Sequence, residues 1–173
     1  MRAFISINIS EEIKKEIKKI QDLLPEFFGK KIELQNLHLT LKFLGEVEEK
    51  DAEETKEKLR KIKIEKFATE IDEIGVFSEK FLRIIWLHMK DCDNLQKQID
   101  AALKNLFEPE KRFMSHLTIA RIKGIKDKEG FLQDLKKIKV EKIKFKVDNF
   151  CLMKSELTAE GPKYSVLEEY NLS

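Results

Sequence analysis

The sequence predicts an α+β fold of two similar lobes that face each other across a central cleft. Segments with the two-residue period of strands alternate with segments that have the 3.6-residue period of helices. A His-apolar-Thr-apolar tetrapeptide occurs twice, each time in the same order of expected elements. No Pro-, Gly- or Ser-rich linker divides the 173 residues, so we expect a single domain over 1–173 in which the two lobes interleave.

The expected elements follow in chain order. The first strand covers 2–9, and Ser10 then offers an N-cap for a helix that keeps its apolar spacing up to Pro25. Alternating runs predict further strands over 38–44, 67–77, 81–89, 116–122, 142–153 and 164–170. Helical spacing predicts further helices over 51–62, 93–107 and 129–138. Strands joined as hairpins favour α+β over a doubly wound parallel sheet.

Two of the three histidines begin the repeated tetrapeptide, in His38-Leu39-Thr40-Leu41 and in His116-Leu117-Thr118-Ile119. From composition alone, two such matches among three histidines have a probability on the order of one in ten thousand. A lone histidine in a strand is more often a satisfied core residue, but the repetition favours a functional site. We therefore expect the two tetrapeptides to face each other across the cleft.

Strand alternation gives each tetrapeptide one chemical face. His38 and Thr40 share one face, as do His116 and Thr118, while the aliphatic residues between them point into the core. An imidazole can act as acid or base near neutral pH, and a threonine hydroxyl can bind a phosphoryl oxygen. Two such faces would surround one anion with an acid, a base and two hydroxyls.

Three neighbouring residues are placed by the same alternation. Lys42 is expected on the face of His38 and Thr40, either as a solvated rim lysine or as a phosphate contact, and Phe43 is expected on the opposite, apolar face. Arg121 is expected on the face opposite His116 unless the strand bulges there, in which case it could neutralise phosphate charge.

The charge balance leaves room only for a local nucleic-acid site. With 34 Lys+Arg against 32 Asp+Glu the net charge is +2, which excludes a globally basic nucleic-acid wrapper. The segment 111–146 nevertheless contains 12 Lys/Arg and 4 Asp/Glu, so it could either follow an RNA backbone or form a solvated helix face.

Neither a metal nor another cofactor is expected. No carboxylate stands at metal-ligand spacing from either repeated histidine. Cys92 and Cys151 form neither a disulfide framework nor a metal-binding pattern. Because the chain also lacks a signal peptide and any apolar run near the roughly 18 residues of a membrane span, we expect a cytoplasmic protein without membrane contact.

The sequence resembles the 2H phosphoesterase superfamily, and specifically its RNA 2′,3′-cyclic phosphodiesterase family, also called the 2′-5′ RNA ligase or LigT-like family. Besides the two tetrapeptides, the resemblance includes Arg2-Ala3-Phe4-Ile5, Lys42-Phe43-Leu44-Gly45, Arg83-Ile84-Ile85-Trp86, Ala120-Arg121, Ser155-Glu156-Leu157, Gly161 and Tyr164. It covers nearly the whole chain. One departure is His88, where family members often have a small residue; Trp86 and His88 are expected to pack in the core.

The resemblance implies that each lobe is an antiparallel sheet with helices on its outer face. It further implies hydrolysis of an RNA-terminal or nucleoside 2′,3′-cyclic phosphate to a 2′-phosphomonoester. In that reaction His38 corresponds to the proton donor for the departing O3′, and His116 to the proton acceptor that activates water. Thr40 and Thr118, with Arg121 as a further candidate, would hold the phosphate oxygens.

Three alternatives remain open at the level of sequence. One is a phosphodiesterase for another small cyclic phosphate, such as ADP-ribose 1″,2″-cyclic phosphate. Another is a nucleotide- or RNA-binding module without turnover, although binding alone does not need two proton-transfer groups. The third is the reverse reaction, 2′-5′ ligation of RNA ends. The expected partners are therefore RNA ends or small nucleotides that carry a cyclic phosphate, and the expected state is a monomer.

Overall fold

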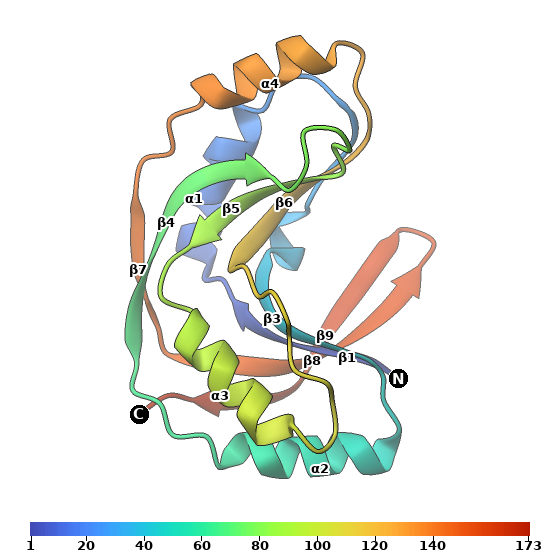
Figure 1. Cartoon of the computed structure of the whole chain (residues 1–173), viewed down its shortest axis with the longest axis vertical. Coiled ribbons are helices and arrows are strands. Elements are labelled where there is room, and N and C mark those ends of the chain that lie inside the picture. Colours follow the sequence, from blue (N-terminus) through green and yellow to red (C-terminus); the bar gives the residue numbers. More distant parts are fainter.

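The computed structural model describes residues 1–173 as one curled sheet of nine strands with helices against its outer side (Figure 1). The elements in chain order are β1 (Arg2–Asn8), α1 (Glu11–Asp22), β2 (Phe28–Lys31), a 3₁₀ turn (Leu34–Asn36), β3 (His38–Glu46), α2 (Glu49–Arg60), β4 (Phe67–Val76), β5 (Ile84–Met89), α3 (Asp93–Leu103), β6 (His116–Gly124), α4 (Lys128–Lys137), β7 (Ile143–Val147), β8 (Asn149–Thr158) and β9 (Gly161–Asn171). None of the helices combines the length and the apolar composition of a membrane-spanning segment.

The sheet consists of two halves that meet at a narrow seam. Its strand order is β7-β4-β5-β6-β3-β1-β8-β9, with β2 paired to β6, and every pairing is antiparallel. The two halves are joined where β3 pairs with β6, through the single residue pair Leu39 and Leu117. We call β3-β1-β8-β9 lobe 1 and β7-β4-β5-β6-β2 lobe 2. The predicted α+β fold of antiparallel sheets is confirmed.

The two lobes repeat one order of elements. In lobe 1, β1 is followed by α1, and β3 by α2; in lobe 2, β5 is followed by α3, and β6 by α4. The strands β3 and β6 also share the same sequence of buried, half-buried and exposed positions over their first eight residues. The internal repeat that the tetrapeptides indicate is therefore present in the fold.

One apolar core of 34 buried residues holds both lobes together, and it lies between the sheet and the helices. The helix α1 shows how the sequence directs this packing. Ser10 caps it by accepting a hydrogen bond from the backbone N–H of Ile13 (3.4 Å), and Ile13, Ile17 and Ile20 are buried at helical spacing. This confirms the cap and the buried face predicted from sequence.

Several predicted boundaries are wrong, among them the end of α3, which lies at Leu103 rather than 107, and the start of β9, which lies at Gly161 rather than 164. The strand expected over 142–153 is two strands, β7 and β8, which belong to different lobes and are separated at Asp148. Apolar and polar residues alternate on both sides of Asp148. Periodicity therefore does not reveal that the two segments pair with different strands. The strand expected over 81–89 begins only at Ile84, and the four-residue strand β2 is too short to show any period.

Candidate active site

The two tetrapeptide strands contain a β-bulge at the same position. In β1 and β3, Ser6 pairs with Thr40 but Ile5 pairs with Lys42, so Leu41 has no partner. In β5 and β6, Trp86 pairs with Thr118 but Ile85 pairs with Ala120, which leaves Ile119 as the extra residue. Because an extra residue shifts alternation by one position, the side chains beyond each bulge exchange faces.

The bulges decide which residues reach the cleft. Arg121 lies on the same face as His116 and Thr118. From the sequence, this placement was expected only if the strand bulges. The predicted places of Lys42 and Phe43 are wrong: Lys42 is buried behind the strand, whereas Phe43 is 70% exposed and lines the cleft. Phe43 in lobe 1 thus occupies the position that Arg121 occupies in lobe 2.

A cleft of about 610 Å³ lies between the two tetrapeptide strands. Five residues named from the sequence line it together: His38, Thr40, His116, Thr118 and Arg121. Its other walls come from β1, β2 and the β8–β9 hairpin, which projects beyond the curled sheet (Figure 1).

Both histidine rings are held by a backbone carbonyl two residues upstream. The Nδ1–H of His38 donates to the carbonyl of Asn36 at 2.7 Å, and the Nδ1–H of His116 donates to the carbonyl of Met114 at 2.8 Å. A carbonyl can only accept, so Nδ1 carries a proton in both rings. Each Nε2 is therefore the atom that can gain or lose a proton, and that of His38 lies 3.0 Å from the Thr40 hydroxyl.

Aromatic rings fix the two imidazoles from their other sides. His38 contacts Phe4 and Tyr164, with ring centroids 5.0 and 5.1 Å apart, and His116 contacts Phe77 edge-on at 4.9 Å. The sequence did not indicate that Phe4 and Phe77, two of 12 phenylalanines, contact the histidines, because periodicity alone cannot separate a core ring from a ring packed beside the site.

Burial lowers the pKa of His38 below its ordinary value of 6.5. The hydrogen bond to the Asn36 carbonyl opposes this shift, while the positive charges of Arg121 and His116 add to it. The neutral form of His38 therefore predominates at pH 7 in the unliganded protein. An anion bound between the two rings would offset the nearby cations and favour the protonated form.

We predict that an NMR titration of the His38 ring protons gives a midpoint below 6.5 in the unliganded protein and a higher midpoint with inorganic phosphate. The physical reason is that a bound phosphate places a negative charge beside the desolvated imidazolium. This stabilises the protonated ring and raises its pKa. The Arg121→Gln variant is the control, since removing its positive charge should raise the midpoint without phosphate. A midpoint that phosphate does not move would contradict this account.

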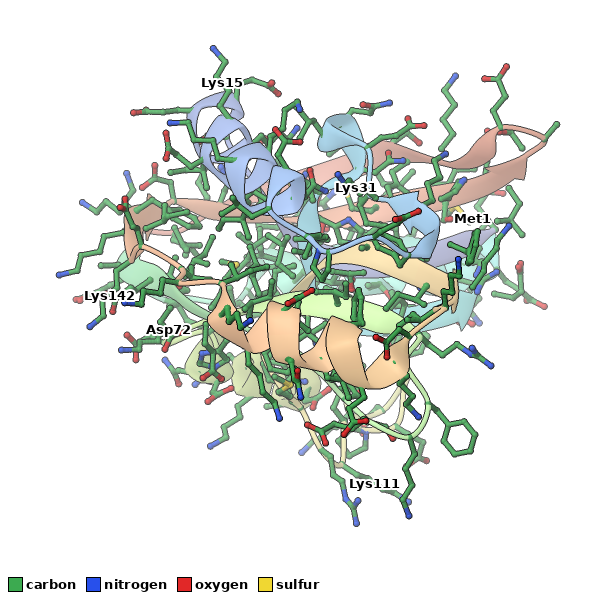
Figure 2. The ribbon with its side chains drawn as sticks, turned by 90° about the horizontal axis from the view of Figure 1, so that it is seen from above. Met1, Lys15, Lys31, Asp72, Lys111 and Lys142 are labelled. Atoms are coloured by element: carbon green, nitrogen blue, oxygen red, sulfur yellow. The ribbon has the colours of Figure 1, made fainter.

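The bases that line the cleft differ from those that composition suggested. Of the 12 Lys and Arg residues in the segment 111–146, only Arg121 lines the cleft; Lys111 and Lys142 lie far apart on the periphery (Figure 2). The other cleft bases are Arg2, Lys30 and Lys31, and Lys30 pairs with Glu33 at 3.0 Å. This distribution favours a solvated surface for most of the basic segment.

The expected core packing holds for Trp86 but not for His88. Trp86 is buried, and its ring lies so close to Gly75 that an added Cβ would stand 2.6 Å from it. His88 is half-buried in register with His116, and its Nδ1 lies 2.8 Å from the carboxylate of Asp72. It does not line the cleft.

Comparison with known proteins agrees with this geometry. The family model described as LigT-like phosphoesterase matches residues 7–86 and again 89–164. The chain belongs to the LigT-like phosphoesterase family. Each matched segment contains one of the two tetrapeptides, and the double match confirms both the family resemblance and the repeat.

Relatives of this LigT-like phosphoesterase include two proteins named RNA 2′,3′-cyclic phosphodiesterase. The one from Methanocaldococcus jannaschii is 38% identical and aligns with 98% of this chain and 100% of its own length. The one from Thermotoga maritima is 36% identical, with 98% and 94% covered. A crystal structure of a Thermus thermophilus protein superposes with a TM-score of 0.83 at 26% identity, covering 99% of this chain and 98% of that protein.

Proposed function

We propose that this phosphoesterase hydrolyses RNA-terminal or nucleoside 2′,3′-cyclic phosphates to 2′-phosphomonoesters by two-histidine acid–base catalysis. The observation that carries the proposal is the matched pair of imidazoles, each held through Nδ1 with its Nε2 left for proton transfer in one cleft. The names of the relatives support the substrate class. A purely structural pair of histidines would not need identical carbonyl anchors on both sides of an open cleft.

In the proposed reaction, Nε2 of His116 takes a proton from a water molecule as its oxygen attacks phosphorus. The P–O3′ bond breaks, and the departing O3′ takes the proton from Nε2 of His38. Phosphorus keeps its bond to O2′, so the product is a 2′-phosphomonoester. Thr40, Thr118 and Arg121 hold the non-bridging oxygens as negative charge develops on them. The bound phosphate also favours the protonated His38 that this step requires.

The direct test is turnover of 2′,3′-cyclic mononucleotides and of oligoribonucleotides with cyclic ends, with the product phosphate assigned by ³¹P NMR. We expect a 2′-phosphate from both. A 3′-phosphate would reverse the roles of the two histidines relative to the ribose oxygens. Turnover of ADP-ribose 1″,2″-cyclic phosphate alone would favour the other small-molecule activity, and binding without turnover would favour a binding module. Incubation of a 2′,3′-cyclic end with a 5′-hydroxyl end tests the reverse ligation.

We predict that EDTA leaves the rate of hydrolysis unchanged. No group of three or more His, Cys, Asp or Glu side chains in residues 1–173 is arranged to hold a metal ion, and we expect Thr40, Thr118 and Arg121 to stabilise the charge on the phosphate oxygens. The measurement is kcat for a cyclic mononucleotide with and without EDTA. Loss of activity that added Mg²⁺, Mn²⁺ or Zn²⁺ restores would contradict two-histidine catalysis.

We further propose that residues 1–173 act as one domain and as a monomer in the cytoplasm. Both histidines and all their partners come from one chain, so the cleft needs no second copy. Cys92 and Cys151 are free and buried, as in a reducing compartment.

A further inference from the structure

The cleft contains a cation that the proposed phosphoryl chemistry does not use. Arg2 is the first residue of β1; it is exposed, and it lines the cleft. No carboxylate lies within 4.0 Å of its guanidinium. Its cross-strand neighbour Glu46 instead lies 3.6 Å from the N-terminal amine. The guanidinium therefore has free donors for an anion, and a phosphate diester suits its planar geometry.

Arg2 lies at a definite place relative to Thr40. Along β1, Ser6 pairs with Thr40, Phe4 with Phe43, and Arg2 with Glu46. Four residues of an extended strand, about 13 Å, thus separate Arg2 from the residue beside Thr40. Between them the floor of the cleft is formed by the rings of Phe4 and Phe43, whose centroids are 6.4 Å apart. This stretch has room for a nucleoside between a cyclic phosphate at Thr40 and an anion at Arg2.

The chemistry decides the direction in which the RNA chain leaves. If His38 protonates the departing O3′, the ribose lies on the His38 side of phosphorus, opposite the water held by His116. That side is lobe 1, where β1 and β3 form the floor. A 5′ extension of that ribose over lobe 1 would lead to Arg2 on β1, whereas Lys31 lies on β2 in lobe 2.

We propose that Arg2 binds the phosphodiester that joins the terminal nucleotide to its 5′ neighbour, and that it makes the enzyme prefer RNA ends over cyclic mononucleotides. This inference rests on the proposed function, and it extends that function by assigning a second phosphate site. Arg2 touches neither the scissile phosphate nor the leaving oxygen in this arrangement. It is a specificity residue rather than a catalytic one.

The test compares adenosine 2′,3′-cyclic phosphate with the dinucleotide ApA carrying the same cyclic end, and with that dinucleotide bearing a neutral methylphosphonate linkage. For Arg2→Ala, we expect the ratio of kcat/KM for the dinucleotide to kcat/KM for the mononucleotide to fall about tenfold, because KM for the dinucleotide rises. A tenfold change is about the contribution of one charge-assisted hydrogen bond at an exposed site. The methylphosphonate should lower the same ratio in the parent protein but not in Arg2→Ala. The salt slope for the dinucleotide should lose about 0.7 in the variant.

Two further variants complete the design. Lys144→Ala is the matched control, because Lys144 is an exposed base on the far edge strand β7 of the same sheet and does not line the cleft. It should leave the ratio unchanged. Arg2→Lys keeps the charge without the planar guanidinium and should restore part of the ratio.

The outcomes separate this inference from the proposed function. Hydrolysis of both substrates with a ratio that Arg2→Ala does not change would overturn the inference alone. The same holds if Lys31→Ala, rather than Arg2→Ala, removes the preference, since the chain would then leave over lobe 2. Failure of the parent protein to hydrolyse either substrate would overturn the proposed function and the inference with it.

Discussion

Alanine at either His38 or His116 is expected to lower kcat for cyclic phosphate hydrolysis by about 10²- to 10⁴-fold, the usual contribution of one general acid or base. Each ring is half-buried at the cleft, and the core residues beside it, Leu39 and Leu117, remain unchanged. Both variants should therefore fold. The measurement is kcat at saturating cyclic mononucleotide, with circular dichroism and thermal unfolding as checks of the fold.

The pH dependence of kcat/KM provides an independent test of the same mechanism. Only the state with His116 neutral and His38 protonated is productive, so kcat/KM should trace a bell between two macroscopic pKa values of the pair. Each alanine variant should lose one limb. His88→Ala is the matched control, because that histidine pairs with Asp72 outside the cleft, and it should retain both limbs. A folded His38→Ala or His116→Ala variant with near-parental kcat would exclude the mechanism.

The largest effect on stability is expected at Lys42. Its ammonium is buried, 2.7 Å from the carboxylate of Asp100 and 2.6 Å from the carbonyl of Glu108. The second carboxylate oxygen accepts from the amide of Gln96 and from the backbone N–H of Glu110. This network ties β3 to α3 and to the loop that leads to β6. Removing Lys42 alone leaves a carboxylate without its charge partner.

We expect Lys42→Ala to lower the free energy of unfolding by about 3–5 kcal/mol, and the double variant Lys42→Met/Asp100→Leu to lower it by much less. Urea unfolding at neutral pH measures both. A Lys42→Ala variant within 1 kcal/mol of the parent, an order-of-magnitude bound for a surface pair, would show that the network is not coupled to folding.

The network also has a predicted pH dependence. Burial alone would raise the pKa of Asp100, but the hydrogen bonds from Lys42, Gln96 and Glu110 outweigh it, so the net pKa lies below the ordinary 3.8. A carboxyl group with a lowered folded-state pKa stabilises the protein above its unfolded value, and that contribution is lost as the pH falls through the folded value. The stabilising contribution of ionised Asp100 in the parent should therefore be lost in acid, as the pH falls below about 3.8.

The sequence was sufficient to predict the fold class, the repeat and four of the cleft residues, because all of these depend on local periodicity or on a repeated motif. His38, Thr40, His116 and Thr118 precede the bulges, so simple alternation places them correctly. The residues beyond the bulges could not be placed, since a bulge depends on pairing with a neighbouring strand. For the same reason the change of partner at Asp148 is invisible in a continuous alternating run.

The difference between Phe43 and Arg121 has a consequence for how a ligand is oriented. If the two lobes presented identical side chains, a phosphate ester could bind in two orientations related by the two-fold axis, with equal affinity and with the histidines exchanging roles. Phe43 and Arg121 occupy equivalent positions, two residues after the unpaired residue of each bulge, and one is apolar where the other is cationic. This difference helps to remove the degeneracy: we expect the nucleoside to bind over the phenyl ring and the anionic oxygens to bind at the guanidinium. The directionality of the catalyst is thus encoded outside its duplicated histidines.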